Sequence, residues 1–386
     1  MLKWMKRIGL GLLIIVALAV VALLATGNGH VLRGIRCTYL AGVQNPDIDD
    51  MRFFVVDTLS PGTPDPWPVH PRANSMEIAE ADLAWSDSMG TTAFIVIKND
   101  SIIYERYWGG TGPETVTNSF SMAKSVTAML IGIAIDEGHI GSIDDRVGKY
   151  LPEFNSGTDS LLTIRNLLSM ASGIPFGESY FNPFGFMAKA YFGKNLEEET
   201  MKYRTDRIPG SDWAYEGGNT VLLSLILKRT TGKTLTQYAE EKLWPRLGTE
   251  DEAYWNLDKE GGLEKSFSAI YATARDFARL GSLYLHDGVW KGDTIVPTAF
   301  VRESLTPSGI PDKNGLECTW YGLHWWLGDH EKGGKMYVCR GLRGQYVIAL
   351  PEHNMIMVRI GHHQDKERLN YLPTDLYRYI DIALKL

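Results

Sequence analysis

Cysteine is scarce in this chain, which contains only Cys37, Cys318 and Cys339 among its 386 residues. No two of them have the short spacing of a zinc site, so we expect no metal centre. If the protein is exported, one disulfide can form, and Cys318 with Cys339 is the better pair. Three unpaired, buried thiols are at least as good an expectation.

Positive charge is also in deficit, because 39 Lys and Arg residues face 46 Asp and Glu residues, for a net charge of −7. No dense basic patch interrupts this balance, which argues against a nucleic-acid partner. Internal repeats and low-complexity tracts are absent from the sequence. The remaining composition, 44% hydrophobic and 22% charged, is that of a globular protein with one large domain or two small ones.

One long apolar run, residues 8–25, follows Lys3, Lys6 and Arg7. Its length of about 18 residues is near the lower limit for crossing a bilayer. Positive charges before such a run stay in the cytoplasm, so the rest of the chain would be exported. Residues 1–27 are therefore predicted to be a signal anchor in the inner membrane, with the domain facing the periplasm or another extracytoplasmic side. The alternative is a cleaved signal peptide that leaves a secreted or periplasmic protein.

The rest of the chain changes from strands to helices and back to strands. Residues 28–75 are predicted to be an extended segment, since residues 61–68 are dense in proline. Alternating apolar residues then predict strands and helices at these positions: a helix over 76–88, strands over 92–98 and 102–108, strands over 321–327, 335–340, 344–350 and 355–361, and a helix over 374–384. This order predicts an α/β (α+β) domain over 76–386. Its sheet part is about 76–115 and 320–386, and its helical part about 116–319.

Residues 118–125 place Ser121 and Lys124 three positions apart, just before an apolar run that ends near Gly138. The pattern predicts a buried helix with both side chains on one face of its first turn. The helix dipole and burial both favour a neutral lysine, which can accept the serine proton. Ser-x-x-Lys alone also occurs by chance in many helices, so the rest of the chain has to support this hypothesis.

Two later segments supply the missing parts of an acyl-transfer site. Tyr215 follows a Pro-Gly turn and precedes a helix, so a loop can present its phenol to move a proton. Residues 339–345 join two late strands, and their backbone N–H groups can stabilise an oxyanion together with the N–H of Ser121. The alternatives are a core tyrosine and an ordinary hairpin turn.

Ser-x-x-Lys, a tyrosine motif and a glycine-containing strand, in this order, resemble the penicillin-recognising serine hydrolases. The resemblance covers about 76–386. It is to the branch that holds class C β-lactamases, D-alanyl carboxypeptidases, family VIII esterases and, most of all, 6-aminohexanoate-dimer hydrolases. It implies an antiparallel sheet flanked by helices, with the site between the sheet part and the helical part. It also implies Ser121, Lys124 and Tyr215 as catalytic residues, the N–H groups of Ser121 and Leu342 as the oxyanion hole, and no cofactor.

The chain departs from the β-lactamase pattern at two places. Tyr215-Glu216-Gly217 stands where Tyr-x-Asn is usual, and Cys339-Arg340-Gly341 stands where Lys-Thr-Gly is usual. These differences favour an ester or small linear amide over a β-lactam or a D-Ala-D-Ala peptide. A non-catalytic, membrane-anchored binding protein on the same fold is a further alternative. The resemblance assigns substrate contacts to a set of residues: Gly217, Asn219, Cys339, Arg340, Gly341, Arg343 and Gln345. The aromatic stretch 180–192 is expected to line the acyl pocket.

Overall fold

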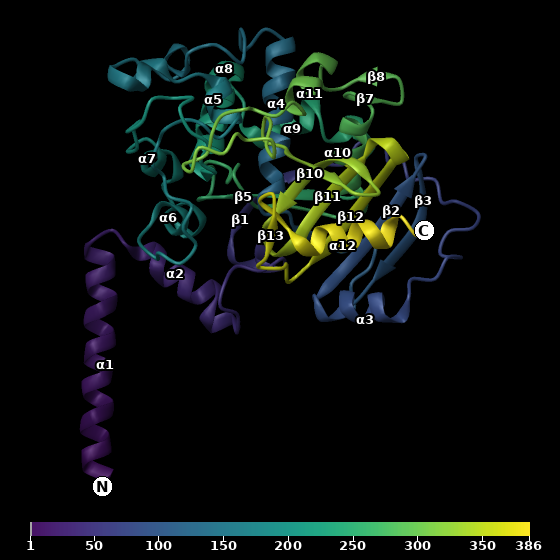
Figure 1. Ribbon diagram of the computed structural model, residues 1–386. Helices are drawn as coiled ribbons and strands as arrows, with labels where there is room; N and C mark the ends of the chain where they lie inside the picture. Colours follow the sequence, from purple (N-terminus) through teal and green to yellow (C-terminus); the bar gives the residue numbers. More distant parts are fainter. Residues whose placement is uncertain (1) are drawn as a thin grey trace.

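A six-stranded antiparallel sheet forms one side of the molecule in the computed structural model, which describes residues 2–386 (Figure 1). Its strand order is β3-β2-β12-β11-β10-β9. The strands are β2 (Thr91–Lys98), β3 (Ser101–Tyr107), β9 (Trp326–His330), β10 (Gly334–Gly341), β11 (Gln345–Leu350) and β12 (Met355–Gly361). Strand β2 pairs with β12 from the other end of the chain. The structure thus confirms the predicted antiparallel sheet built from both ends.

Both faces of the sheet are buried, because helices cover each one. Side chains alternate along β2, so Ile95 and Ile97 join one core cluster while Phe94 and Val96 join the other. The first face packs against α10 (Ala274–Leu285), and the second against α3 (Glu80–Ser88) and α12 (Thr374–Ala383). Gly281 of α10 is required here, since a Cβ at this position would lie 2.7 Å from Val347.

The helical part surrounds α4 (Met122–Asp136), which packs against α8 (Gly217–Thr231) and α9 (Leu235–Lys242). Residues 122–134 of α4 are all buried, so tertiary packing on every side stabilises a helix that has no polar face. The remaining α-helices of this part are α5 (Ile164–Leu168), α6 (Phe186–Phe192), α7 (Leu196–Thr200) and α11 (Thr298–Ser304).

A second, four-stranded sheet was not predicted. Its order is β1-β5-β6-β4, from β1 (Val55–Leu59), β4 (Thr117–Asn118), β5 (Ala253–Leu257) and β6 (Ile270–Ala272). The prediction that residues 28–75 are simply extended needs correction, because they contain α2 (Gly29–Cys37) and β1. The proline-rich stretch is irregular as expected, but β1 pairs with β5, almost 200 residues later, and no local pattern encodes that contact.

The N-terminal helix α1 (Leu2–Ala25) extends away from the domain (Figure 1). It is long and apolar enough to cross a membrane, and none of its most apolar stretch is buried in the protein. All three cysteines are buried and unpaired, which agrees with the thiol alternative and not with a Cys318–Cys339 disulfide.

Short elements complete the chain. They are the hairpins β7 (Val289–Trp290) with β8 (Asp293–Thr294) and β13 (Arg368–Leu369) with β14 (Leu372–Pro373), and the 3-10 helices η1 (Tyr39–Ala41), η2 (Asp50–Phe53), η3 (Val147–Lys149), η4 (Pro152–Phe154), η5 (Gly157–Leu161), η6 (Pro245–Leu247), η7 (Leu342–Gly344) and η8 (Pro351–His353). The strand predicted over 321–327 begins later, at Trp326, because His324 has a positive φ of 57° that extended strands do not accommodate.

Candidate active site

Ser121 is the N-cap residue of the buried helix α4, and Lys124 lies in its first turn. The Lys124 Nζ donates a hydrogen bond of 2.9 Å to the Ser121 Oγ and one of 2.8 Å to the carbonyl oxygen of Phe267. Lys124 is only 1% exposed. A buried amine in direct contact with a serine hydroxyl is placed to accept its proton.

The backbone just before Ser121 is strained. Phe120 has a positive φ of 46°, a conformation that costs an L-residue about 1–3 kcal/mol. Hydrogen bonds on both sides hold it: the Phe120 N–H donates to Asn118 Oδ1 at 2.8 Å, and the Ser119 N–H donates to the Ile270 carbonyl of β6 at 2.7 Å. This turn between β4 and α4 presents Ser121 at the helix N-terminus.

Tyr215 lies beside the same amine. The Lys124 Nζ is 4.9 Å from the centre of the Tyr215 ring. Tyr321 and Trp326 hold this ring, with centroids 6.0 Å and 5.4 Å away. Among the described residues, no hydrogen bond engages the Tyr215 hydroxyl, and its role in proton transfer remains a prediction.

The turn after β10 packs directly against the nucleophile segment. A Cβ at Gly341 would lie 2.1 Å from the carbonyl oxygen of Ser119, so only glycine permits this close approach. Arg343, with a φ of 63°, and Gly344 then reverse the chain into β11. The contact brings Leu342 to the pocket that contains Ser121.

Ser121 opens into a narrow, mainly apolar cavity of about 80 Å³. Its lining residues are Asn45, Pro46, Phe120, Ser121, Tyr180, Met187, Ala188, Tyr191, Phe192, Phe267, Ser268 and Leu342. The aromatic stretch 180–192 supplies five of these residues, as the sequence suggested. A serine hydroxyl, an adjacent amine and an apolar cavity thus lie together, an arrangement that can support acyl transfer.

The model of the family described as Beta-lactamase matches residues 78–374. The chain belongs to the beta-lactamase family. Its fold and its relatives make it a beta-lactamase-fold hydrolase, and they confirm the resemblance that the three motifs indicated.

Individual relatives are consistent with this placement. The 6-aminohexanoate-dimer hydrolase of Paenarthrobacter ureafaciens is 25% identical over 302 residues, which span 72% of this chain and 74% of that enzyme. A Bacillus anthracis structure provisionally described as a 6-aminohexanoate-dimer hydrolase superposes with a TM-score of 0.72 at 23% identity, covering 86% of this chain and 92% of that one. The structure of a family VIII carboxylesterase superposes with a TM-score of 0.64 at 18% identity, covering 82% of this chain and 98% of that one.

Several residues predicted to contact substrate are buried elsewhere. Cys339 is fully buried beneath the sheet, where burial raises the pKa of its thiol to about 12. Asn219 is fully buried in α8, and its Nδ2 contacts the sulfur of Met170 at 3.6 Å. Gln345 is also fully buried, and its side-chain amide donates to the carbonyl oxygens of Leu342 and Gly361. Gln345 therefore helps to fix the turn that contains Leu342.

The other predicted residues border the site or support it. Gly217 begins α8, and its N–H donates to Glu178 Oε2 at 2.7 Å. The Arg340 guanidinium lies over Trp326, 4.2 Å from the ring centre, and donates to the Tyr371 carbonyl. Arg343 contacts Asp47, with 3.3 Å between the Arg343 Nη1 and the Asp47 carboxylate. A substrate contact by any of these residues remains a prediction.

Residues 45–50 contribute to the candidate site, although no sequence pattern indicates it. Asn45 and Pro46 line the Ser121 cavity, and Asp47 binds Arg343, the residue after Leu342. Asp50 accepts hydrogen bonds from Asn118 Nδ2 at 3.1 Å and from the hydroxyls of two tyrosines, Tyr191 and Tyr271. Residues 45–50 all precede the segment 78–374 that matches the family, so no family motif marks them.

Asp50 connects the N-terminal segment to the strained turn before Ser121, because Asn118 both donates to Asp50 and accepts from Phe120. We expect Asp50→Asn to lower kcat by about 10- to 100-fold with little change in KM, since small displacements of a nucleophile have effects of this size. Steady-state kinetics and the rate of labelling by a fluorophosphonate measure it. Asp49→Asn, at the exposed neighbouring position, is the matched control. Wild-type kcat in Asp50→Asn would contradict this role for Asp50.

Glu216, next to Tyr215, is a buried carboxyl group without a charge partner. Its Oε2 atom is buried and has no hydrogen-bond partner in the described structure. Burial first, and then the nearby charge of Glu178, raise the pKa of Glu216 to about 8. The neutral acid therefore predominates at neutral pH.

This shift predicts a pH dependence of stability. An unfolded chain loses the Glu216 proton near pH 4.5, whereas the folded chain keeps it until about pH 8. The free energy of unfolding should therefore fall as the pH rises through this window, by up to a few kcal/mol. We expect Glu216→Gln to remove this part of the decline, so that it melts above the wild type at pH 8 and close to it near pH 4.5. Thermal melts from pH 4.5 to 8.5, with exposed Glu77→Gln as control, measure the difference. Parallel curves for Glu216→Gln and the wild type would show that Glu216 ionises normally.

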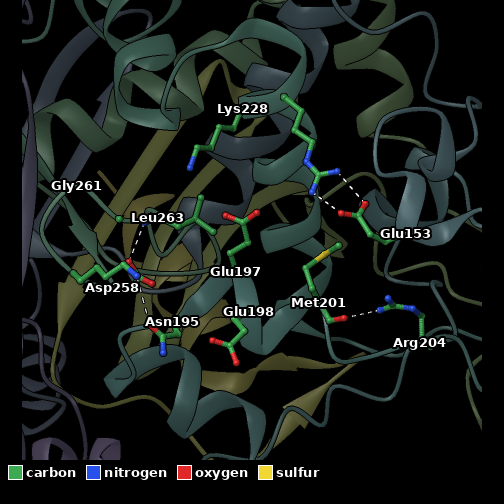
Figure 2. Close-up of a pocket in the computed structure, with 13 residues that line it drawn as sticks. Glu153, Asn195, Glu197, Glu198, Met201, Arg204, Lys228, Asp258, Gly261 and Leu263 are labelled. Atoms are coloured by element: carbon green, nitrogen blue, oxygen red, sulfur yellow. Dashed lines mark hydrogen bonds and ion pairs between the residues drawn. The ribbon is translucent and has the colours of Figure 1, made fainter.

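A larger cavity, about 520 Å³, lies in the helical part near α7 and α8 (Figure 2). Many of its charged side chains are already engaged: Arg229 pairs with Glu153, and Arg204 donates to the Met201 carbonyl. Among the described residues that line it, there is no serine, threonine, cysteine or tyrosine. Elsewhere in residues 2–386, no group of three His, Cys, Asp or Glu side chains is arranged to hold a metal ion. Ser121 remains the candidate nucleophile, because the Lys124 amine contacts its hydroxyl.

Proposed function

We propose that the protein is a serine hydrolase that cleaves an ester or a small linear amide through an acyl-enzyme. The observation that carries this proposal is the 2.9 Å hydrogen bond between the Lys124 Nζ and the Ser121 Oγ at the head of a buried helix. The identity to a 6-aminohexanoate-dimer hydrolase supports a linear amide, and the likeness to a carboxylesterase fold is compatible with an ester.

In the first step, the Ser121 Oγ attacks the substrate carbonyl carbon while the Lys124 amine accepts the hydroxyl proton. The N–H groups of Ser121 and Leu342 stabilise the resulting oxyanion. The bond to the leaving group then breaks, and Tyr215 relays a proton from Lys124 to the departing oxygen or nitrogen. Water attacks the acyl-enzyme in the second step, and Lys124 and Tyr215 move the protons in the reverse sense.

The N-terminal helix bears on the cellular location of the protein. We infer that α1 is a signal anchor that holds the enzyme on the extracytoplasmic face of the inner membrane. Its apolar stretch is unburied, and three positive charges precede residue 8. Cleavage at the Ala25-Thr26-Gly27 site is the alternative, and the mass of the protein purified from whole cells distinguishes the two.

A hydrolysis screen tests the proposed chemistry. It compares p-nitrophenyl esters, linear amide dimers and the cephalosporin nitrocefin, with mass spectrometry to detect an acyl group on Ser121. We expect turnover of an ester or a linear amide and a mass adduct on the peptide that contains Ser121. Preferential hydrolysis of nitrocefin would instead favour the β-lactamase alternative, and no labelling by any substrate or by a fluorophosphonate would favour the binding-protein alternative.

A further inference from the structure

Large apolar side chains are exposed near the membrane anchor. Leu40 is 78% exposed, Tyr39 68% and Phe181 91%, and Ile35, Tyr180 and Phe184 are also exposed. We call the six residues Ile35, Tyr39, Leu40, Tyr180, Phe181 and Phe184 the anchor-side patch. They come from α2, η1 and the loop before α6. Exposed apolar groups that gather in this way mark a surface for binding.

Chain continuity places α2 where α1 would leave the bilayer. Helix α1 ends at Ala25 and α2 begins at Gly29. Two backbone hydrogen bonds close the junction, from the N–H of Thr26 to the Ala22 carbonyl and from the N–H of Asn28 to the Leu23 carbonyl. Such a short, hydrogen-bonded connection places the start of α2 beside the end of the anchor, and η1 follows directly after α2 (Figure 1).

The aromatic stretch 180–192 contacts α2 through hydrogen bonds and packing. The His30 Nε2 atom lies 2.8 Å from the Pro183 carbonyl oxygen, and the Arg33 Nη1 donates to the Gly193 carbonyl at the end of α6. Gly34 packs against the ring of Phe192. The loop and α2 therefore form one surface beside the end of α1.

The same loop borders the Ser121 cavity. Tyr180 lines it, and so do Met187 and Ala188 from the following helix. Phe181 and Phe184 do not line this cavity. Phe181 is exposed and lines a neighbouring open cavity together with Tyr180 and Leu342. The patch thus continues from the membrane anchor to the mouth of the candidate active site.

From this arrangement we propose that the anchor-side patch docks on the lipid bilayer, so that the active-site mouth opens at the membrane surface. Tyr and Phe are suited to the boundary between headgroups and acyl chains. Arg36, exposed between Ile35 and Tyr39, has the charge that anionic headgroups attract. The substrate class follows, if the proposed function is correct: esters or linear amides with an acyl chain long enough to partition into the bilayer.

Site-directed spin labelling measures docking without reference to catalysis. The full chain is placed in vesicles of phosphatidylethanolamine and phosphatidylglycerol, and a label is attached at Phe181→Cys. The three native cysteines are buried, so they react slowly. We expect the label at 181 to collide more with oxygen than with a soluble nickel complex. A label at Val69→Cys, an exposed position beside β3, should show the opposite. Equal accessibility to nickel at both positions would overturn the proposal.

The kinetic test compares a long-chain p-nitrophenyl ester in the same vesicles with soluble p-nitrophenyl acetate. Tyr39→Ser/Leu40→Ser should lower the rate on the vesicle-borne ester by about 5- to 10-fold and leave the soluble rate within about 2-fold. Val69→Ser is the matched control and should change neither rate. Equal effects on both esters would overturn the proposal.

Two further outcomes distinguish bilayer docking from the proposed hydrolase function and from dimerisation. If the wild type hydrolyses neither ester, the proposed hydrolase function fails, while the spin label still decides docking. If the label at 181 is protected from nickel in detergent without lipid, and light scattering shows a dimer, then a second copy covers the patch and the bilayer proposal is overturned.

Discussion

Ser121→Ala should lower kcat/KM on the best ester or amide substrate by at least about 10³-fold, because no acyl-enzyme can form without the hydroxyl. The effect is expected on the chemical step, so KM should change little. The same substitution should abolish covalent labelling by a fluorophosphonate and the acyl adduct seen by mass spectrometry. Initial rates at saturating and subsaturating substrate measure the two parameters separately.

Ser125→Ala is the control for Ser121→Ala. Ser125 lies four residues later on the same buried helix, and its hydroxyl donates at 2.6 Å to the His324 carbonyl. This variant loses a buried hydrogen bond, at a cost of about 1 kcal/mol in stability, but keeps the nucleophile and the labelling. If Ser121→Ala instead retains a turnover similar to that of Ser125→Ala, the acyl-enzyme mechanism is wrong.

The sequence predicted those parts of the fold that have strong local patterns. Helix α4 was recognisable because every residue from Val126 to Ile135 is apolar or small, and the paired strands β2, β3, β11 and β12 because they are rich in Ile and Val. The order of the Ser121, Tyr215 and Gly341 motifs was enough to predict the family. In each of these cases the information lies within a few neighbouring residues.

The parts of the fold and the site that were not predicted depend on contacts between segments far apart in the sequence. Strand β1 pairs with β5 across a long stretch of chain, and Asp50 meets Asn118 only because the fold brings η2 to β4. A single aspartate in a polar segment has no periodicity or spacing that distinguishes it from a surface residue. The part of the site that lies outside the family match was therefore invisible before the structure.

Burial of both strand faces explains why some predicted contacts are buried instead. The last six residues of β10 and all of β11 are at least partly buried, so alternation does not show which side chains face substrate. Cys339 and Gly341 share one face of β10, where Cys339 joins the core cluster that contains α4 and Gly341 meets Ser119. Family motifs gave the position of this turn correctly but not the direction of each side chain.

Lys124→Met should reduce kcat by about 10³-fold while leaving the thermal midpoint unchanged or higher. The side chains have similar length, but Met cannot accept a proton, so the Ser121 hydroxyl loses its base. No carboxylate of the described residues forms an ion pair with Lys124, and a buried amine without such a partner is costly to the fold. Replacing Lys124 with Met removes this cost, so the folded state should become more stable while activity falls. Rate measurements and thermal melts of Lys124→Met and the wild type test whether kcat falls while the thermal midpoint stays the same or rises.

Lys124→Arg separates the base from the positive charge. Guanidinium stays protonated in proteins, so this variant places a permanent cation near Tyr215 and Ser121 but offers no base. Activity should fall about as far as in Lys124→Met if proton acceptance is the function of the amine. Recovery of more than about a tenth of wild-type kcat in Lys124→Arg would mean that the positive charge alone suffices. Tyr215, whose ring centre is 4.9 Å from the Lys124 Nζ, would then be the first candidate for the base.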